Sequence, residues 1–151
     1  MAISFDALQA NYPTMPKEQF FKLLGGQWPK LVGDDNYRNT CATRLSYALR
    51  GAGVAIPAKY QEAIDGSGAS LVLKVRTMGK LMNELFPVHW GMSKIEGTAI
   101  DIPARQGVVA YHVKWDNATG HFDLWTGKDF VGKGRLEDIA DGYDVVLWSL
   151  S

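Results

Sequence analysis

Cys41 and His121 have the residue types of a thiol nucleophile and its general base. Cys41 is the only cysteine among 151 residues. It falls at the start of a predicted helix, where unpaired backbone N–H groups and the helix dipole stabilise a thiolate. His121 opens a predicted strand, and a cysteine on an early helix followed by a histidine on a later antiparallel strand is the chain order of papain-like enzymes. We therefore predict a thiol hydrolase site built on these two residues.

Both residues also have ordinary structural explanations. Free cysteine is among the most buried residue types, and a histidine at a strand start is commonly a surface residue or one with satisfied hydrogen bonds. The non-enzymatic alternative is a small α+β binding module with Cys41 in its core. That alternative predicts a thiol inert to iodoacetamide at neutral or mildly acidic pH, where an activated thiolate reacts quickly.

The residue that orients the imidazole is predicted to be Asp123, two positions after His121 and on the same face of the strand. A two-residue hairpin loop at 127–128 places Gly132 opposite Asp123, and a glycine there leaves room for a carboxylate. Asp129, close to the turn, is the competing residue. Asp123 is equally compatible with an exposed strand position, so the third member stays open at this point.

Helical patterns dominate the first half of the chain. The clearest spans residues 41–52, where Cys41 shares one face with apolar residues at i+4, i+7 and i+11. Asn39 is its predicted N-cap, and Arg44 is interpreted as an ion-pair or capping residue. Two shorter helices are predicted earlier, one capped by Ser4 with Phe5 and Leu8 buried, and one opened by Pro16 with Phe20, Leu23 and Leu24 facing inward.

Strand patterns dominate the second half. A strand is predicted over residues 71–75 and is followed by a helix with Met78, Leu81, Met82, Leu85 and Phe86 as its apolar set. The period then changes to two, which predicts strands at 107–115, 121–125, 130–134 and 143–151. Helices followed by antiparallel strands indicate an α+β fold, and the length fits a single domain over residues 1–151.

Composition excludes several classes of function. Sixteen basic and sixteen acidic residues cancel, and no segment concentrates one sign, so a nucleic-acid surface is not expected. No apolar run is long enough to span a bilayer, and no basic leader precedes an apolar core. We therefore expect synthesis in the cytoplasm without a signal peptide. One cysteine and three dispersed histidines, among them His89 and His112, predict neither a metal site nor a cofactor.

Two ordered blocks resemble the type VI secretion amidase effectors, most closely their fourth family. "NTCATRLSYALRGAGVAIP" resembles the nucleophile block of that family, and "GVVAYHVKWDNATGHFDLWTG" resembles its histidine block. "LVLKVRTMGKLMNELF" and "VVLWSL" are similar to its middle and closing segments. These blocks cover most of residues 36–150, whereas the first thirty-five residues match loosely.

The resemblance implies a papain-like amidase that cuts peptidoglycan stem peptides, typically between D-glutamate and diaminopimelate, a DL-endopeptidase type of hydrolysis. It implies delivery by the type VI system into the periplasm of a target bacterium, and a cognate immunity protein that plugs the site. Cys41 matches the nucleophile of the family and His121 its base. We expect the Cys41 backbone N–H and a second donor to hold the oxyanion. A papain-like protease or transferase acting on protein is the enzymatic alternative.

The chain departs from the family pattern at the acidic position. The resembled family places an aspartate on the strand after the histidine strand, near Gly132 here, and a glycine cannot orient an imidazole. Asp123, facing Gly132, is the predicted replacement. The additional cysteines that are frequent in this region of the family are missing as well, so no corresponding disulfide is expected.

Overall fold

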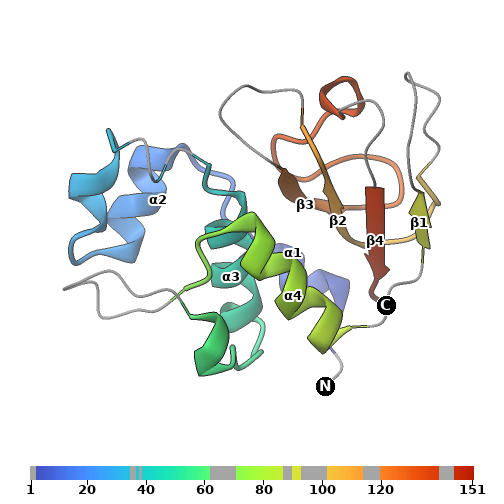
Figure 1. Cartoon of the computed structure of the whole chain (residues 1–151), viewed down its shortest axis with the longest axis horizontal. Helices are drawn as coiled ribbons and strands as arrows, with labels where there is room; N and C mark the ends of the chain where they lie inside the picture. The colour runs from blue at the N-terminus through green and yellow to red at the C-terminus, as the bar shows by residue number, and fades with distance from the viewer. Residues whose placement is uncertain are drawn as a thin grey trace.

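An antiparallel sheet and a group of four α-helices make up the part of the chain that the structure describes (Figure 1). The computed structural model describes residues 3–34, 37, 39–61, 71–86, 90–92, 102–113, 120–139 and 145–151. The helices come first along the chain and lie beside the sheet that the later strands form (Figure 1). The predicted α+β class is confirmed.

Three of the four helices follow the predicted apolar patterns. α1 spans Phe5–Asn11, and the Ser4 hydroxyl caps it by accepting a hydrogen bond from the Ala7 N–H at 3.1 Å. α3 spans Cys41–Gly51 and α4 spans Val75–Leu85, each burying its predicted apolar face. Short 3₁₀ helices occur at Trp28–Leu31 (η1), Ala58–Tyr60 (η3) and Leu136–Asp138 (η4).

The remaining helix, α2, spans Lys17–Leu24 and turns a different face inward from the one predicted. Pro16 lies at its N-cap rather than at its first helical position. Leu23 is 52% exposed, and Phe21 is buried beside Phe20. The ring of Phe21 packs edge-on against Trp28, with centroids 5.1 Å apart. A pair of large aromatic rings buries more apolar area than the leucine, and it sets the rotation of this helix.

The prediction of a strand over residues 71–75 is wrong. Leu71 forms only an isolated bridge, and α4 begins at Val75. The Val72 N–H donates to the Ser46 hydroxyl at 2.9 Å instead of to a neighbouring strand. Leu71 and Val72 are buried in apolar clusters formed with the helices, and a side chain supplies the hydrogen bond that a sheet would have supplied to Val72.

The sheet has the strand order β1-β4-β2-β3, and every neighbouring pair is antiparallel. Three of its strands fall where the alternating pattern predicts them. The strand β3 has the predicted bounds, whereas β2 and β4 are shorter than predicted. Their bounds are Gly107–Tyr111 for β2, His121–Trp125 for β3 and Val145–Ser149 for β4, and the short β1, Trp90–Met92, was not predicted. Residues 114–115 and 143–144 lie outside the described residues.

The predicted turn after β3 has the expected register but no regular strand follows it. Trp125 and Phe130 form an isolated antiparallel bridge, and the Val131 N–H donates to the Leu124 carbonyl at 3.0 Å. Extending that register places Gly132 opposite Asp123, as predicted. The segment 131–134 then leaves strand geometry because its later N–H groups bond to a side chain of β3.

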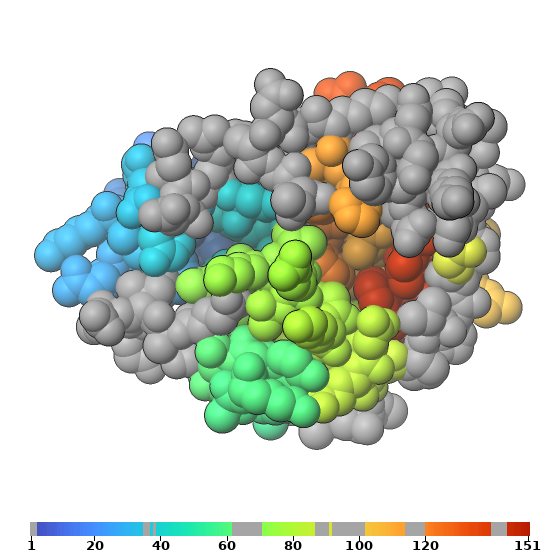
Figure 2. All heavy atoms as spheres, in the orientation of Figure 1, coloured from blue at the N-terminus to red at the C-terminus, as the bar shows by residue number. Residues whose placement is uncertain are grey.

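Each face of the sheet carries a buried apolar cluster. The larger cluster joins Val108, Phe122, Leu124 and Trp148 of the sheet to α1, α3 and α4, and the smaller one contains Val109, Tyr111, Trp125, Val145 and Leu147. In the space-filling view α4, in yellow-green, lies between η3 and β4 (Figure 2). β3 is an edge strand and packs against α3. The start of the helix and the start of that strand are thereby brought together.

Arg44 ties the connection between α1 and α2 to α3. Its side chain is buried at 8% exposure. The Nη1 atom donates to the Pro13 and Met15 carbonyls at 3.0 and 2.7 Å. The Nε atom donates to the Thr40 hydroxyl at 2.8 Å, and the guanidinium lies 4.8 Å from the centre of the Phe20 ring. Arg44 thus contacts neutral oxygens and a ring, so its role is a cross-link rather than the ion pair or helix cap considered from the sequence.

We expect Arg44→Lys to lower the free energy of unfolding by about 2 kcal/mol, because an ammonium cannot reproduce the fork of donors or the stacking. Urea denaturation measures the change. Arg50→Lys, at an exposed position of the same helix, is the matched control and should stay within about 0.5 kcal/mol of the unaltered chain. Equal effects of the two substitutions would contradict the cross-link.

Candidate active site

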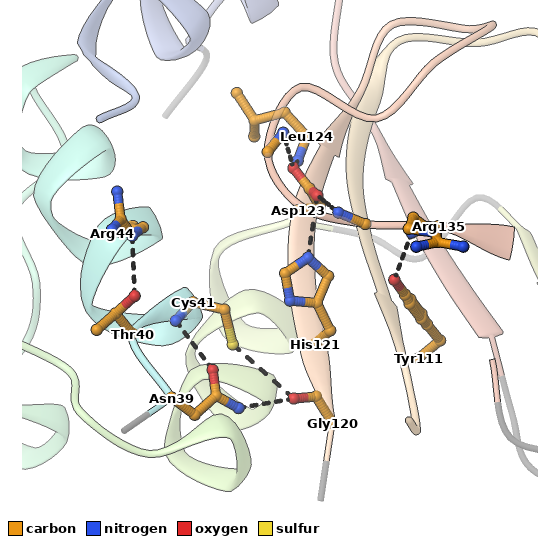
Figure 3. A network of polar contacts seen from close by, with 12 residues as sticks. Asn39, Thr40, Cys41, Arg44, Tyr111, Gly120, His121, Asp123, Leu124 and Arg135 are labelled. Atoms are coloured by element: carbon orange, nitrogen blue, oxygen red, sulfur yellow. Dashed lines mark hydrogen bonds and ion pairs between the residues drawn. The ribbon is translucent and has the colours of Figure 1, made fainter. Parts of the chain in front are cut away.

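Cys41 begins α3, and its thiol points toward the first residues of β3 (Figure 3). The side chain is buried, with the residue 4% exposed. The Sγ atom lies 3.9 Å from the Gly120 carbonyl oxygen, within range of a weak S–H hydrogen bond. The thiol thus lies at the end of α3 that carries the positive partial charge of the helix dipole. Its predicted position in the first helical turn is confirmed.

His121 lies between this thiol and a carboxylate. Its Nε2 atom is 3.0 Å from Asp123 Oδ2. Its other ring nitrogen, Nδ1, lies on the side of Cys41 (Figure 3). The imidazole also packs on Tyr111, with ring centroids 5.5 Å apart. The three residues predicted from the sequence are therefore brought together in the order thiol, imidazole, carboxylate.

Asp123 is fully buried, and backbone groups surround its carboxylate. Oδ1 accepts hydrogen bonds from the Leu124 N–H at 2.8 Å and the Gly132 N–H at 2.7 Å. Oδ2 accepts from the Gly134 N–H at 2.7 Å and faces His121. Hydrogen bonds to an ionised acceptor are short and strong. These donors compensate the desolvation of the carboxylate and fix the oxygen that meets the imidazole.

Neither glycine of this loop has room for a side chain. A Cβ at Gly132 would lie 2.8 Å from Asp123 Oδ1, and a Cβ at Gly134 would lie 2.7 Å from Asp123 Oδ2 and 2.5 Å from a Phe130 ring carbon. Distances this short do not occur in real packing. The carboxylate of Asp123 therefore occupies the space that a side chain at position 132 would fill.

The electrostatics of the site favour a protonated imidazole. Desolvation by burial lowers the pKa of His121, but the hydrogen bonds and charges of Asp123 and Cys41 outweigh it and raise the pKa to about 9. An imidazolium between a thiol and a carboxylate stabilises a thiolate and can protonate a leaving group.

The competing residues stay away from this centre. Asp129 is exposed in the turn, where its N–H donates to the Thr126 hydroxyl at 3.0 Å. His112 is exposed beside β2, and His89 lies outside the described residues.

No group of three metal-ligating side chains occurs among the described residues. Within the same part of the chain, no helix is long and apolar enough to cross a membrane.

Two expectations about the start of α3 need correction. The Cys41 backbone N–H, predicted to hold an oxyanion, donates instead to Asn39 Oδ1 at 3.1 Å. Thr40, not Asn39, occupies the N-cap position and makes no side-chain cap. Asn39 also donates from Nδ2 to the Gly120 carbonyl at 2.9 Å. The sequence predicted Asn39 only as a cap, because nothing local indicates that its second bond reaches across the chain.

The roles of Gly120 and Gly134 were also missed. The carbonyl of Gly120 receives both the thiol and the Asn39 amide, and the N–H of Gly134 completes the bonds to Asp123. Both act through backbone atoms, which carry no residue-specific pattern. The two glycines at positions 132 and 134 were the one signal in the sequence that the backbone there comes close to another group, which is the Asp123 carboxylate.

Comparison with known proteins gives one family and a set of similar structures. The profile of the family described as "Type VI secretion system (T6SS), amidase effector protein 4" matches residues 37–148. Cys41, His121 and Asp123 all lie within the matched range. No curated protein sequence matches the chain.

The similar structures extend over the whole chain. The type VI effector Tae4 from Enterobacter cloacae is 25% identical with a TM-score of 0.80, covering 100% of this chain and 98% of its own. The Tae4–Tai4 effector–immunity complex from the same organism is 23% identical with a TM-score of 0.80 and full coverage of both chains. The Tae4–Tai4 complex from Salmonella Typhimurium is 19% identical with a TM-score of 0.81, again with full coverage. Residues 3–34, which precede the matched range of the profile, therefore share the fold as well.

We expect Gly132→Ala to lower the free energy of unfolding by about 1–3 kcal/mol, because its Cβ must displace the Asp123 carboxylate. The His121 pKa, followed by NMR titration, should fall at the same time. Gly79→Ala is the matched control, since a Cβ there meets nothing within 4 Å in the middle of α4. It should raise stability slightly. A Gly132→Ala protein with unchanged stability and unchanged His121 titration would contradict the described geometry.

We also expect stability to depend on pH through His121. A group whose pKa is raised on folding contributes stability that is complete below its unfolded value and is lost as the pH rises through the folded value. For His121 this loss falls between the ordinary histidine range and about pH 9, and at about 1.4 kcal/mol per unit it amounts to roughly 3 kcal/mol.

Urea denaturation across this pH range measures the change in stability. Comparison of the unaltered chain with His121→Gln separates the contribution of His121 from the contributions of the lysines and tyrosines. The variant should lose less stability as the pH rises. Parallel curves for the two proteins would show that His121 has no raised pKa.

Proposed function

The chain belongs to the fourth family of type VI secretion amidase effectors, which are antibacterial peptidoglycan amidases with a papain-like fold, and we propose that Cys41, His121 and Asp123 carry its amidase reaction. The observation that supports this assignment is the continuous chain of contacts from the thiol through the imidazole to a buried carboxylate. A fully buried aspartate with its second oxygen on the imidazole fits an orienting role better than a surface role.

In the first stage, the Cys41 thiolate attacks the carbonyl carbon of the scissile amide. A C–S bond forms, and the π electrons of the carbonyl move to oxygen. His121, held by Asp123, then gives its proton to the amide nitrogen. The electron pair on the oxygen re-forms the C=O bond as the C–N bond breaks, so a free amine leaves and a thioester remains on Cys41. In the second stage, His121 takes a proton from water, the hydroxide attacks the thioester, and the thiolate is released.

The proposed substrate is the peptidoglycan stem peptide. The bond proposed to be hydrolysed joins D-glutamate to diaminopimelate, which makes the reaction a DL-endopeptidase reaction. The family resemblance of the two blocks around Cys41 and His121 supports this choice of bond. We propose that the chain is exported by the type VI apparatus and acts in the periplasm of the target bacterium.

We further propose a cognate immunity protein. The Tae4 proteins from Enterobacter cloacae and Salmonella Typhimurium have been solved in complex with their Tai4 immunity proteins. An effector that hydrolyses the cell wall endangers its own producer, so such a partner would have to block access to Cys41. The proposed site needs neither a metal nor a cofactor.

Digestion of purified sacculi tests the nucleophile. We expect the unaltered chain to release soluble muropeptides and Cys41→Ala to release none, with an unchanged thermal unfolding curve. Mass spectrometry of the products identifies the bond by the new amine end on diaminopimelate. Retained activity in Cys41→Ala would sink the thiol mechanism. Cleavage of casein with intact sacculi would instead favour the protease alternative.

A pair of aspartate substitutions tests the third residue. Asp123→Asn should lower kcat by about 100-fold or more, because the imidazole loses its orientation and its charge partner. Asp129→Asn removes an exposed carboxylate from the same hairpin and should leave kcat within about twofold. A larger loss in Asp129→Asn than in Asp123→Asn would transfer the role to the turn residue.

A further inference from the structure

Asn39 makes two hydrogen bonds that join the helix of the nucleophile to the strand of the base. Its Oδ1 atom accepts from the Cys41 N–H at 3.1 Å, and its Nδ2 atom donates to the Gly120 carbonyl at 2.9 Å. Figure 3 shows the amide between these two backbone groups, below the thiol. One bond therefore ends on the nucleophile residue itself and the other on the residue that precedes His121.

Helix capping explains only half of this arrangement. The bond from the Cys41 N–H to Oδ1 satisfies a donor at the start of α3, as a cap does. The bond from Nδ2 to Gly120 spans 81 positions of the sequence and satisfies nothing in the helix. A residue chosen for capping alone would need an acceptor but no donor.

The packing of α3 on β3 is mainly apolar, and apolar contact is not directional. A pair of hydrogen bonds at the point where the two elements meet specifies their separation more closely. The relevant separation is the one between the Cys41 thiol and the His121 imidazole, since each lies within one residue of a clamped backbone atom. Misplacement by about 1 Å can cost a reaction about 100-fold.

The same carbonyl also faces the sulfur. Gly120 O lies 3.9 Å from Cys41 Sγ, and it can accept from a thiol but repels a thiolate. The Nδ2–H of Asn39 is directed at this oxygen and offsets part of its negative charge. Loss of that donor should therefore make the thiolate harder to form as well as less well placed.

We propose that Asn39 is a positioning residue of the amidase site, which holds the α3 start against Gly120 and so sets the geometry of the Cys41–His121 pair. The inference rests on the proposed thiol mechanism. Asn39 need not touch the substrate, and its effect is on the nucleophile and its base.

Two substitutions separate the hydrogen bond from the Cys41 N–H, which resembles a helix cap, from the hydrogen bond to the Gly120 carbonyl. Asn39→Ser keeps an oxygen that can accept from the Cys41 N–H in a local turn, but its side chain is too short to reach Gly120. Asn39→Ala removes both bonds. The measurements are thermal unfolding, the pH profile of Cys41 alkylation by iodoacetamide, and kcat and KM on muropeptides.

We expect Asn39→Ser to unfold close to the unaltered chain, but its alkylation profile should be displaced to higher pH. Its kcat should fall about 10- to 100-fold, with KM within about twofold. Asn39→Ala should show the same kinetic defects and an additional loss of stability. Asn11→Ala is the matched control, because it removes one part-buried amide bond, to the Ala7 carbonyl at 2.8 Å, at the end of α1. It should change neither the alkylation profile nor kcat.

An Asn39→Ser protein with the alkylation profile and kcat of the unaltered chain would overturn the inference and leave Asn39 a helix cap. The alkylation measurement requires no substrate, so it tests the positioning role even if sacculi are not cleaved. Failure of the unaltered chain to digest sacculi would count against the proposed function, whereas a normal Asn39→Ser alongside an inactive Cys41→Ala would count against the positioning role alone.

Discussion

The buried carboxylate of Asp123 is the group on which the rest of the site depends. A charged side chain without contact to water costs several kcal/mol unless donors surround it. Here the donors are His121 and the backbone N–H groups of Leu124, Gly132 and Gly134. The carboxylate thus holds the loop after the hairpin and the imidazole at once. The raised pKa of His121 follows from this arrangement and from the nearby thiol.

The scaffold has to meet a second requirement, which is to place the start of a helix beside the start of a strand. β3 is the edge strand nearest α3, and the alternation of its side chains separates two tasks. Phe122 and Leu124 face the core shared with the helices, while His121 and Asp123 lie on the other side of the strand. Because β3 is an edge strand, no neighbouring strand among the described residues separates the His121 imidazole from the Cys41 thiol at the start of α3.

Much of this arrangement could be predicted from the residues, because their patterns are local. The helix at Cys41 and the strand at His121 each have a clear apolar period. The register of the hairpin followed from counting outward from residues 127–128, and it placed Gly132 opposite Asp123 correctly. The failures have a common cause in tertiary packing. Phe21 occupies the interior in place of Leu23, and Leu71 and Val72 are buried without forming a strand of the sheet.

The site contacts that could not be predicted are those made by backbone atoms or by a side chain with two partners, one of them distant in sequence. Gly134 and Gly120 act through an N–H and a carbonyl, which every sequence has. Asn39 has an obvious local role at the helix start, and that role hides its second bond to the residue before β3.

The glycine opposite Asp123 provides the space that its carboxylate occupies. The space between β3 and the segment after the hairpin holds one carboxylate, and a Cβ at position 132 would already collide with it. A glycine at the facing position is therefore a condition for an acid at position 123. The pairing of the two positions, rather than either residue alone, explains why the carboxylate of Asp123 fits here.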